Sequence, residues 1–443
     1  MIINSSNIKF MEDQPDESVH HIITDPPYLI NFMNKGWDSE NNIAGSPEFW
    51  KECLRVTKKG GYALVFGHTR THHRVMTAIE DAGWEIRDCL MWLQGQGFPK
   101  SHDLAPKIDK AKGLIGHRGK RVKHHRGQEH LAKPKATGNY EPISPEAKEW
   151  KGWGSALKPA WEVIIMARKP FKGSLTNNVL EHGTGALNID ATRVGSDVMP
   201  AQQTKTETTE IGWEKKGYTT PEKTGRFPAN VILTHSAGCR KVGETTDIRS
   251  GGERTKTCHS GKEPISGGEG SGGTMREESK VELYDCEEGC PVKELNKQAP
   301  KAGNAYKATR KKKTTGGSGD SWTNGGKEEG QDNGIYDGLG GASRFFYCPK
   351  VSTKERNSGG IKNNHPTVKP INLMKWLVKL VSKQGQTVFD PFTGSGSTGM
   401  ACVLLDREFI GTELDPDYCD IAKQKIVWAK NERAKLEEKE NKK

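Results

Sequence analysis

The feature that most constrains this fold is the separation of its apolar residues into two distant segments. These segments lie near residues 20–95 and 365–430, and Gly, Lys, Ser and Thr dominate the sequence between them. Only 33% of the 443 residues are hydrophobic and the mean hydropathy is −0.76, so much of the chain cannot be core. The chain is long enough for one large or two modest domains, with core residues expected near both of its ends.

The first segment alternates between β-rich runs and amphipathic helices, which is typical of a parallel α/β sheet. The apolar run 21–24 stops at Pro26 and Pro27, so Asp25 should lie at the carboxyl end of a strand. Ser46 followed by Pro47 predicts the start of a helix. Further strands are predicted at 62–66, 84–93 and 161–170, a second helix near 75–79, and a basic loop at 100–150.

The second segment repeats this alternation around a glycine-rich loop. Pro370 begins a predicted helix whose apolar residues share one face and which should stop at Gly385. A strand at 387–390, a loop at 391–399, a helix at 400–405 and a strand at 409–413 are predicted to follow. The fold class is therefore α/β, with a mainly parallel sheet. Beyond residue 431 the chain is nearly all charged, which predicts a frayed, solvated helix.

The loop between these two strands reads Asp390-Pro391-Phe392-Thr393-Gly394-Ser395-Gly396-Ser397-Thr398-Gly399. Glycines at a strand-to-helix turn let a ligand approach the backbone without touching a Cβ atom. Glu413 lies 19 residues after Gly394, where its carboxylate can accept both ribose hydroxyls of a nucleoside. The pattern suits a nicotinamide dinucleotide as well as S-adenosylmethionine. A phosphate-binding P-loop is excluded because Met400, not lysine, follows Gly399, and a glycine turn without a ligand is the remaining alternative.

A second motif, Thr24-Asp25-Pro26-Pro27-Tyr28, has residue types that suit methylation of an exocyclic amine. Such an amine is a poor nucleophile because its lone pair is delocalised into the ring. The Asp25 carboxylate and the Pro26 carbonyl can accept its two N–H groups, and the paired prolines fix these acceptors in place. Tyr28 offers an aromatic face for a base flipped out of the helix. The alternative is an ordinary Pro-Pro turn with a capping aspartate.

Taken together, Asp25-Pro26-Pro27-Tyr28 and the segment from Phe389 to Thr398 resemble the amino-methylating DNA methyltransferases of the circularly permuted β group. In that group the catalytic motif precedes the cofactor motif, with a target-recognition region between them. The resemblance implies a Rossmann-like S-adenosylmethionine-dependent methyltransferase fold, circularly permuted, with such an insert. The implied domains are a catalytic domain at 1–172 and 344–432, a partly flexible target-recognition insert at 173–343, and a charged tail at 433–443.

The segment His365-Pro366-Thr367-Val368-Lys369-Pro370 also matches this group. The resemblance implies that His365, Thr367 and Lys369 lie by the methionine end of the cofactor, and that Glu413 holds the ribose. The residues implied to line the cofactor pocket are Asp390, Pro391, Phe392, Gly394, Gly396 and Thr398. Ser5-Ser6 stand where the group usually has an acid beside the adenine. Segments similar to bacterial and prophage modification methylases of restriction-modification systems are Gly67-His68, 92–99 and Arg344-Phe345-Phe346-Tyr347.

The implied reaction is methyl transfer from S-adenosylmethionine to adenine N6 in double-stranded DNA, with the target base flipped out. Cytosine-N4 members of the group more often have Ser at the Asp25 position, so Asp25 favours adenine, and cytosine N4 is the alternative. Three other interpretations stay open: a nicotinamide-dependent oxidoreductase, a catalytically inactive DNA-binding protein, and a methylase of RNA or of a protein amide.

The middle region contains four residues with the types and approximate spacing of a zinc site. His235 and Cys239 form one pair, Cys286 and Cys290 form a second pair, and 47 residues separate the pairs. Four such ligands could hold a tetrahedral structural zinc in a region with little core. Free thiols are the alternative. The glycine-rich runs 249–276 and 315–341 are expected to have no regular structure.

The net charge of +11 favours a polyanionic partner such as DNA, although a solvated basic surface would explain it equally well. Basic runs such as 310–313 would contact phosphates. No apolar run is long enough to span a membrane, and the first residues lack the pattern of a signal peptide. Nine cysteines in such a chain indicate reduced thiols and a cytoplasmic location.

Overall fold

The computed structural model describes most of both apolar segments and parts of the region between them. The described residues are 1–30, 38, 42–94, 101–114, 140–199, 202–203, 207–208, 214–215, 219–221, 223–235, 238–247, 279–287, 290–298, 357, 360–361, 363 and 368–440. The chain divides into two compact units, Met1–Gly95 with Glu162–Lys443, and Gln96–Trp161. This division differs from the predicted domain boundaries, because 96–161 forms a unit of its own.

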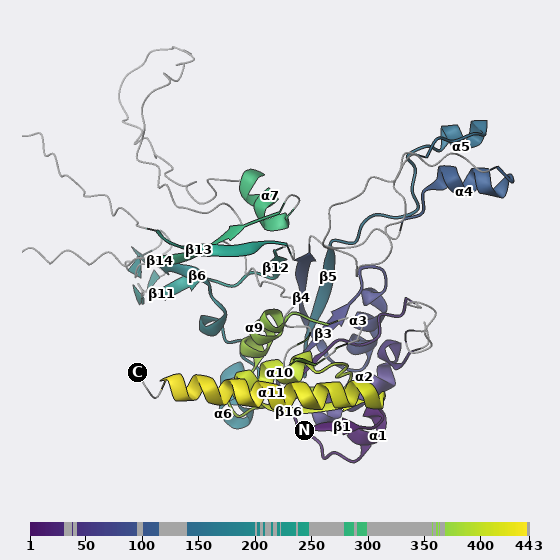
Figure 1. Ribbon diagram of the computed structural model, residues 1–443. Coiled ribbons are helices and arrows are strands. Elements are labelled where there is room, and N and C mark those ends of the chain that lie inside the picture. The colour runs from purple at the N-terminus through teal and green to yellow at the C-terminus, as the bar shows by residue number, and fades with distance from the viewer. Residues whose placement is uncertain are drawn as a thin grey trace, which may run out of the picture. The chain divides into compact units, whose positions relative to one another are not determined.

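The first unit is built on an eight-stranded sheet with the order β1-β16-β15-β2-β3-β5-β4-β12 (Figure 1). Neighbouring strands from β1 to β3 are parallel, as are β4 and β12, whereas β5 is antiparallel to β3. The mainly parallel α/β sheet that the sequence predicts is therefore confirmed. The strands are β1 (Ile2–Asn4), β2 (His21–Thr24), β3 (Tyr62–Gly67), β4 (Glu85–Gln94), β5 (Trp161–Arg168), β12 (Val231–Thr234), β15 (Thr387–Asp390) and β16 (Glu408–Glu413).

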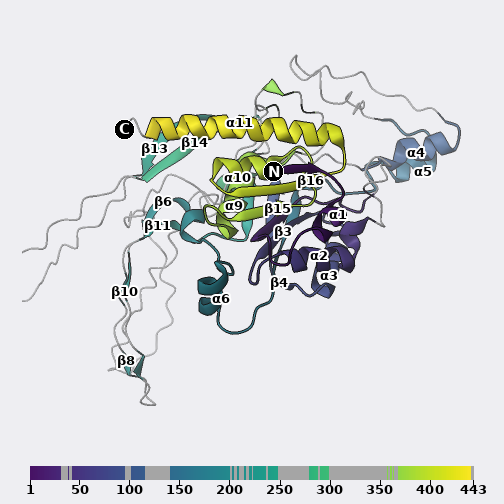
Figure 2. The ribbon, with the colours of Figure 1, turned by 90° about the horizontal axis from the view of Figure 1, so that it is seen from below.

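Helices cover both faces of this sheet because its strands are apolar on both sides. In β3, Leu64 and Phe66 belong to one core cluster and Ala63 and Val65 to the other, as the twofold alternation of a strand requires. Figure 2 shows the helices of the two clusters on opposite sides of the sheet. One cluster includes α1 (Asn7–Glu12), α2 (Pro47–Val56) and α3 (His72–Asp81), and the other includes α9 (Ile371–Val381) and α10 (Ser397–Leu404).

The two ends of the chain meet at one edge of the sheet. Ile2 pairs with Gly411 and Asn4 with Glu413 in parallel register, and the amino group of Met1 donates to the Phe409 carbonyl. Both ribbon views show the purple β1 beside the C-terminal β16 (Figures 1 and 2). The long helix α11 (Pro416–Glu440) packs on α10 and contacts β1 and β16. Residues from both ends of the chain therefore pack in the same core clusters.

The centre of the sheet has the topology that creates a ligand site in open α/β folds. From β15 the chain proceeds through α10 to β16 on one side, whereas from β2 it proceeds through α2 to β3 on the other. The connections therefore diverge between the adjacent parallel strands β15 and β2, and a crevice is expected at their carboxyl ends. Asp390 ends β15, and Asp25 directly follows β2.

The middle region contributes to the main sheet and also forms small sheets of its own. β12 pairs in parallel with β4, and β13 (Arg240–Asp247) forms an antiparallel hairpin with β14 (Ser279–Asp285). The other elements are η3 (Ile43–Gly45), α6 (Leu175–His182), η4 (Asp190–Thr192), β6 (Val194–Met199), β7 (Gln202–Gln203), β8 (Glu207–Thr208), β9 (Glu214–Lys215), β10 (Thr219–Thr220), β11 (Lys223–Arg226) and α7 (Pro291–Gln298). The runs 249–276 and 315–341 and the basic run 310–313 lie outside the described residues.

Three local predictions differ from the structure. Residues 100–150 contain the helices α4 (Leu104–Ala111) and α5 (Pro145–Glu149), not only loop. The Asp109 carboxylate joins them by accepting hydrogen bonds from the amide and the hydroxyl of Ser144, at 2.9 and 2.6 Å. Local pattern does not reveal a contact between residues so far apart. In addition, α9 ends at Val381, four residues before Gly385, and α10 begins at Ser397, three residues before the predicted start.

His21 in β2 couples folding stability to pH. Its Nδ1 accepts a hydrogen bond from the Tyr62 amide at 3.1 Å, and Nε2 lies 3.3 Å from Gln386 Oε1. Complete burial, with a smaller effect of His20, lowers the pKa of His21 from 6.5 to about 3. Between pH 6.5 and about pH 3 the unfolded chain binds more protons at His21 than the folded chain does. The free energy of unfolding therefore decreases as the pH falls.

We expect the His21 contribution to lower the free energy of unfolding by about 2 kcal/mol between pH 6.5 and pH 5. Urea denaturation of the wild type and of His21→Asn at pH 7.5, 6.5 and 5 measures it. The loss on acidification should be smaller in the variant by about this amount. Identical pH dependence in the two proteins would show that His21 is not held neutral by burial.

Candidate active site

The turn after β2 forms the centre of a compact cluster of charged and polar side chains. Asp25 Oδ1 lies 2.8 Å from the Tyr28 hydroxyl, and Asp25 Oδ2 accepts a hydrogen bond from Lys369 Nζ at 2.6 Å. Glu162, from β5, lies 2.9 Å from the Tyr28 hydroxyl and 3.5 Å from Lys369 Nζ. Lys369 Nζ also donates to the Tyr28 hydroxyl at 3.0 Å. The Lys369 ammonium therefore interacts with two carboxylates and one phenol hydroxyl.

Burial makes the charges of this cluster interdependent. The Lys369 side chain is 8% exposed, and those of Asp25 and Glu162 are 23% and 22% exposed. Burial alone lowers the pKa of Lys369. The negative charges of Asp25 and Glu162 raise the pKa by more than burial lowers it, so the pKa lies above its ordinary value. Burial, together with the same two carboxylates, raises the pKa of Tyr28 well above 10. Lys369 is therefore a cation and Tyr28 a neutral hydroxyl.

This arrangement fixes the direction of the Asp25 carboxylate. Each carboxylate oxygen can accept a second hydrogen bond, so an incoming amine can still be held by Asp25. The Tyr28 hydroxyl has one proton and two carboxylates within reach, which anchors its ring from one end. The ring lies 5.4 Å from Lys369 Nζ and 6.1 Å from the centre of the His68 ring.

The Glu413 carboxylate contacts the glycine-rich loop. Glu413 Oε2 accepts the Gly394 amide at 2.8 Å, and Oε1 accepts the Asp415 amide at 2.9 Å. Gly396 has φ of +81°, and a Cβ atom there would lie 3.0 Å from Ala422 of α11, so a side chain is excluded on both grounds. α10 begins directly after Gly396, which leaves free amide groups at the turn.

Asp390 joins the two motifs in the interior. It is 2% exposed, and its Oδ1 and Oδ2 accept hydrogen bonds from the hydroxyls of Thr24 and Thr398 at 2.6 and 2.7 Å. Burial raises the pKa of Asp390 to about 6 despite these bonds and the one from the Phe392 amide at 3.1 Å. A direct hydrogen bond therefore connects the strand that precedes Asp25 to the glycine loop.

The remaining predicted site residues divide into three groups. Phe392 packs against Phe49, with ring centres 5.3 Å apart, and the Pro391 carbonyl accepts a hydrogen bond from Asn7 Nδ2 at 3.1 Å. The Ser5 amide donates to the Glu413 carbonyl at 3.2 Å, so Ser5 lies beside the end of β16. His365 and Thr367, and the similar segments 95–99 and 344–347, lie outside the described residues.

Several residues of the site were not identified from the sequence. Glu162 is the most important, and Gln94 Nε2 donates to its Oε1. The signal that could have revealed Glu162 is its position as an acid directly before the apolar run 163–167. Asn7 is another such residue, because its hydrogen-bond partner Pro391 lies 384 residues away in the sequence. Thr24 belongs to the predicted motif, but its hydrogen bond to Asp390, 366 residues away, was not predicted.

The four predicted metal ligands come together in the structure. The ligand atoms of His235, Cys239, Cys286 and Cys290 all lie within 4.8 Å of one another.

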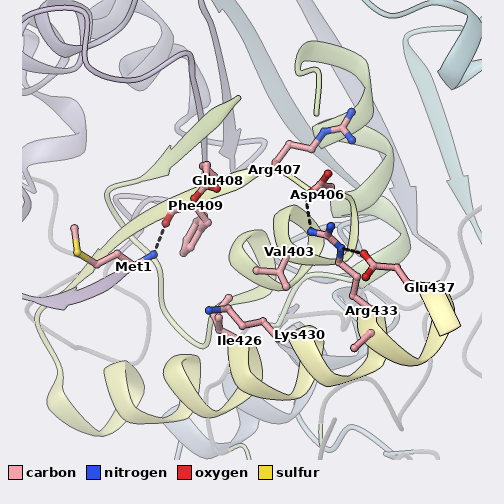
Figure 3. A pocket seen from close by; sticks show the side chains of 11 residues that line it. Met1, Val403, Asp406, Arg407, Glu408, Phe409, Ile426, Lys430, Arg433 and Glu437 are labelled. Carbon is pink, nitrogen blue, oxygen red and sulfur yellow. Dashed lines mark hydrogen bonds and ion pairs between the residues drawn. The ribbon is translucent and has the colours of Figure 1, made fainter. Parts of the chain in front are cut away.

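A cavity of about 420 Å³ lies elsewhere, at the amino end of β16 (Figure 3). Its lining includes Phe409, Lys430 and an ion pair between Arg433 and Asp406. Parallel α/β sheets bind ligands at the carboxyl ends of their strands, so we assign this cavity no part in the chemistry.

Comparison with known families gives a match over nearly the whole chain. Residues 19–424 match the family model described as DNA methylase, and this range includes both the Asp25 turn and the glycine-rich loop.

Curated relatives match over shorter segments. The chain is 44% identical over 78 residues to the type II methyltransferase M.HindIII of Haemophilus influenzae, which is 18% of this chain and 25% of that protein. It is 36% identical over 81 residues to M2.MboI of Moraxella bovis, which is 18% of this chain and 28% of that protein. The matched segments thus span little more than a quarter of these relatives.

Two solved structures are also similar. One is the M1.HpyAVI–SAM complex, with 13% identity and a TM-score of 0.36 over 96% of this chain and 98% of that chain. The other is the cytosine-N4-specific PvuII DNA methyltransferase, with 12% identity and a TM-score of 0.37 over 98% of this chain and 91% of that chain.

Proposed function

The chain belongs to the DNA methylase family, and from this premise we propose that it transfers a methyl group from S-adenosylmethionine to an exocyclic amine of a base in double-stranded DNA. The observation that carries the proposal is the hydrogen bond of 2.6 Å between Thr24 and Asp390. This bond holds the turn containing Asp25 and the glycine-rich loop together at the carboxyl ends of the adjacent strands β2 and β15, where the chain connections diverge.

The residues of the loop suit a nucleoside-containing cofactor. Gly396, with φ of +81°, allows the tight turn that leads into α10, and Glu413 ends β16 with a carboxylate that can accept ribose hydroxyls. Glu413 now accepts two backbone amides, so it is already held in position. When bound, S-adenosylmethionine would supply an electrophilic methyl group on its sulfonium.

The Asp25 turn would prepare the amine for reaction. Asp25 and the Pro26 carbonyl would accept its two N–H groups, which draws the lone pair out of conjugation with the ring. Lys369 and Tyr28 fix Asp25 through hydrogen bonds of 2.6 and 2.8 Å, so the acceptor does not have to reorganise during the reaction. The ring of Tyr28 would support the flipped base.

We propose adenine N6 as the target because an aspartate, and not a serine, stands at position 25. Cytosine N4 is the second candidate, since the same acceptors suit either amine. The net charge of +11 supports a DNA substrate, and the insert 173–343 would read the target sequence. Among the described residues, no helix has the length and apolar character needed to cross a bilayer.

The proposal is tested by expressing the full chain in a bacterial host that lacks both modifications, then digesting its DNA to nucleosides for mass spectrometry. N6-methyldeoxyadenosine is expected, and sequencing of the modified positions would give the recognition sequence. N4-methyldeoxycytidine instead would correct the target base. If well-expressed protein leaves neither nucleoside above the empty-vector level and also transfers no label to purified duplex DNA, the proposed activity is wrong.

A further inference from the structure

We propose that His235, Cys239, Cys286 and Cys290 bind one structural zinc ion that fastens the β13–β14 hairpin and α7 to the edge strand β12. Each ligand lies at an end of one of these elements. His235 directly follows β12, Cys239 directly precedes β13, Cys286 directly follows β14, and Cys290 directly precedes α7. A metal at this point would join four element ends through one centre.

The separations between the ligand atoms fit tetrahedral zinc. Tetrahedral bonds of about 2.3 Å to sulfur and about 2.0–2.1 Å to nitrogen place S and N roughly 3.6 Å apart. His235 Nδ1 lies 3.4 Å from Cys286 Sγ and 3.7 Å from Cys290 Sγ. The three cysteines are free thiols and not disulfides. Three thiolates and one imidazole are a ligand set that zinc prefers.

The surroundings of the cluster give a reason for a metal. Cys290 is 0%, Cys239 2% and His235 6% exposed, so these polar groups have little contact with water. The apolar cluster around them contains few large side chains: Leu233 and Val292, with Leu93, Val231 and Leu295 partly buried. Such a small core contributes little stability, and metal binding commonly supplies it in regions of this kind.

Neighbouring groups orient the ligands and offset their charge. The Tyr284 ring stacks on His235 with ring centres 4.1 Å apart. Glu287 lies beside the turn before Cys239, where its Oε1 accepts a hydrogen bond from the Gly238 amide at 3.4 Å. Zinc with three thiolates has a net charge of about −1. Lys293 Nζ, which donates to the Cys286 carbonyl at 2.8 Å, and the amino end of α7 at Cys290 place positive charge beside it.

The site would be structural, because the protein fills all four tetrahedral positions. It also lies one strand from the elements of the active site. Trp92 of β4 donates to the Thr234 hydroxyl of β12 at 2.6 Å, and Gln94 of β4 donates to Glu162. Fastening the hairpin to β12 would therefore hold the middle region in register with the sheet.

The test is metal analysis of the full chain purified without chelators, by inductively coupled plasma mass spectrometry, with X-ray absorption at the zinc edge. About one zinc per chain with a shell of three sulfurs and one nitrogen is expected. Cys286→Ser and Cys290→Ser should lower the zinc content at least about tenfold, since each removes a ligand. Cys89→Ser, at a half-buried cysteine outside the cluster, should keep it.

Wild-type protein without stoichiometric zinc, which also fails to bind added Zn²⁺ after chelation, would overturn the proposal. So would a zinc shell dominated by oxygen, or zinc retained in full by both cluster variants. If the variants do not fold, the wild-type stoichiometry and absorption spectrum still decide. None of these readouts depends on methyl transfer, so they are independent of the proposed function.

Discussion

Replacing Asp25 with Asn is expected to reduce methyl transfer by about 10²–10³-fold or more, while binding of S-adenosylmethionine stays within a few-fold of wild type. The substitution keeps the size of the side chain but removes the charge that accepts the amine. The hydrogen bonds that hold the cofactor loop should be unaffected, because Asp390 accepts them from Thr24 and Thr398. Transfer of labelled methyl to duplex DNA and calorimetric titration with the cofactor measure the two effects separately.

Asp81→Asn is the matched control, since Asp81 is exposed at the end of α3. Its activity should equal that of the wild type. An Asp25→Asn protein with wild-type turnover would remove Asp25 from the reaction. A folded variant that loses cofactor binding as strongly as turnover would place Asp25 in the cofactor pocket instead.

Replacing Lys369 with Met is the second substitution with a large expected effect. The ammonium lies 2.6 Å from Asp25 and 3.5 Å from Glu162, so its removal leaves two neighbouring carboxylates without a counter-charge. We expect a loss of stability of about 2 kcal/mol, at the low end for a disrupted ion pair because both acids keep some contact with water. Methyl transfer at pH 7 should fall at least about 10-fold.

Urea denaturation and transfer of labelled methyl to duplex DNA measure the two effects. Lys369→Arg distinguishes the electrostatic role from a purely structural one, because it keeps a positive charge beside Asp25 and Glu162. It should retain more activity than Lys369→Met. Lys383→Met, at an exposed lysine beyond the end of α9, should behave like the wild type. Equal losses in Lys369→Met and Lys369→Arg would contradict the assigned role.

The parts of the site that could be predicted from sequence are those written in contiguous residues. One such pattern is the strand that ends before Asp25 and its two prolines. Another is the strand, glycine loop and helix from Thr387 onward. Each can be predicted from neighbouring residues alone. Glu413 could be placed because the length of one helix fixes the spacing to the next strand. The four metal ligands could be paired because His235 and Cys239, like Cys286 and Cys290, lie close in the sequence.

What could not be predicted depends on contacts between distant residues. Lys369 was expected beside the cofactor from family resemblance, whereas its bond to Asp25 joins residues 344 positions apart and no local pattern contains it. Glu162 reaches Tyr28 across 134 residues, and only the order of the strands brings them together. Strand order is set by how the two apolar faces are covered, which is a property of the whole core.

The most direct test of the account is a crystal structure of the full chain with S-adenosylhomocysteine. The ribose is expected on Glu413, the ligand against the backbone of Gly394 and Gly396, and its sulfur facing the space in front of Asp25 and Pro26. A ligand bound away from the carboxyl ends of β15 and β2, or a sulfur separated from Asp25 by intervening protein, would contradict it.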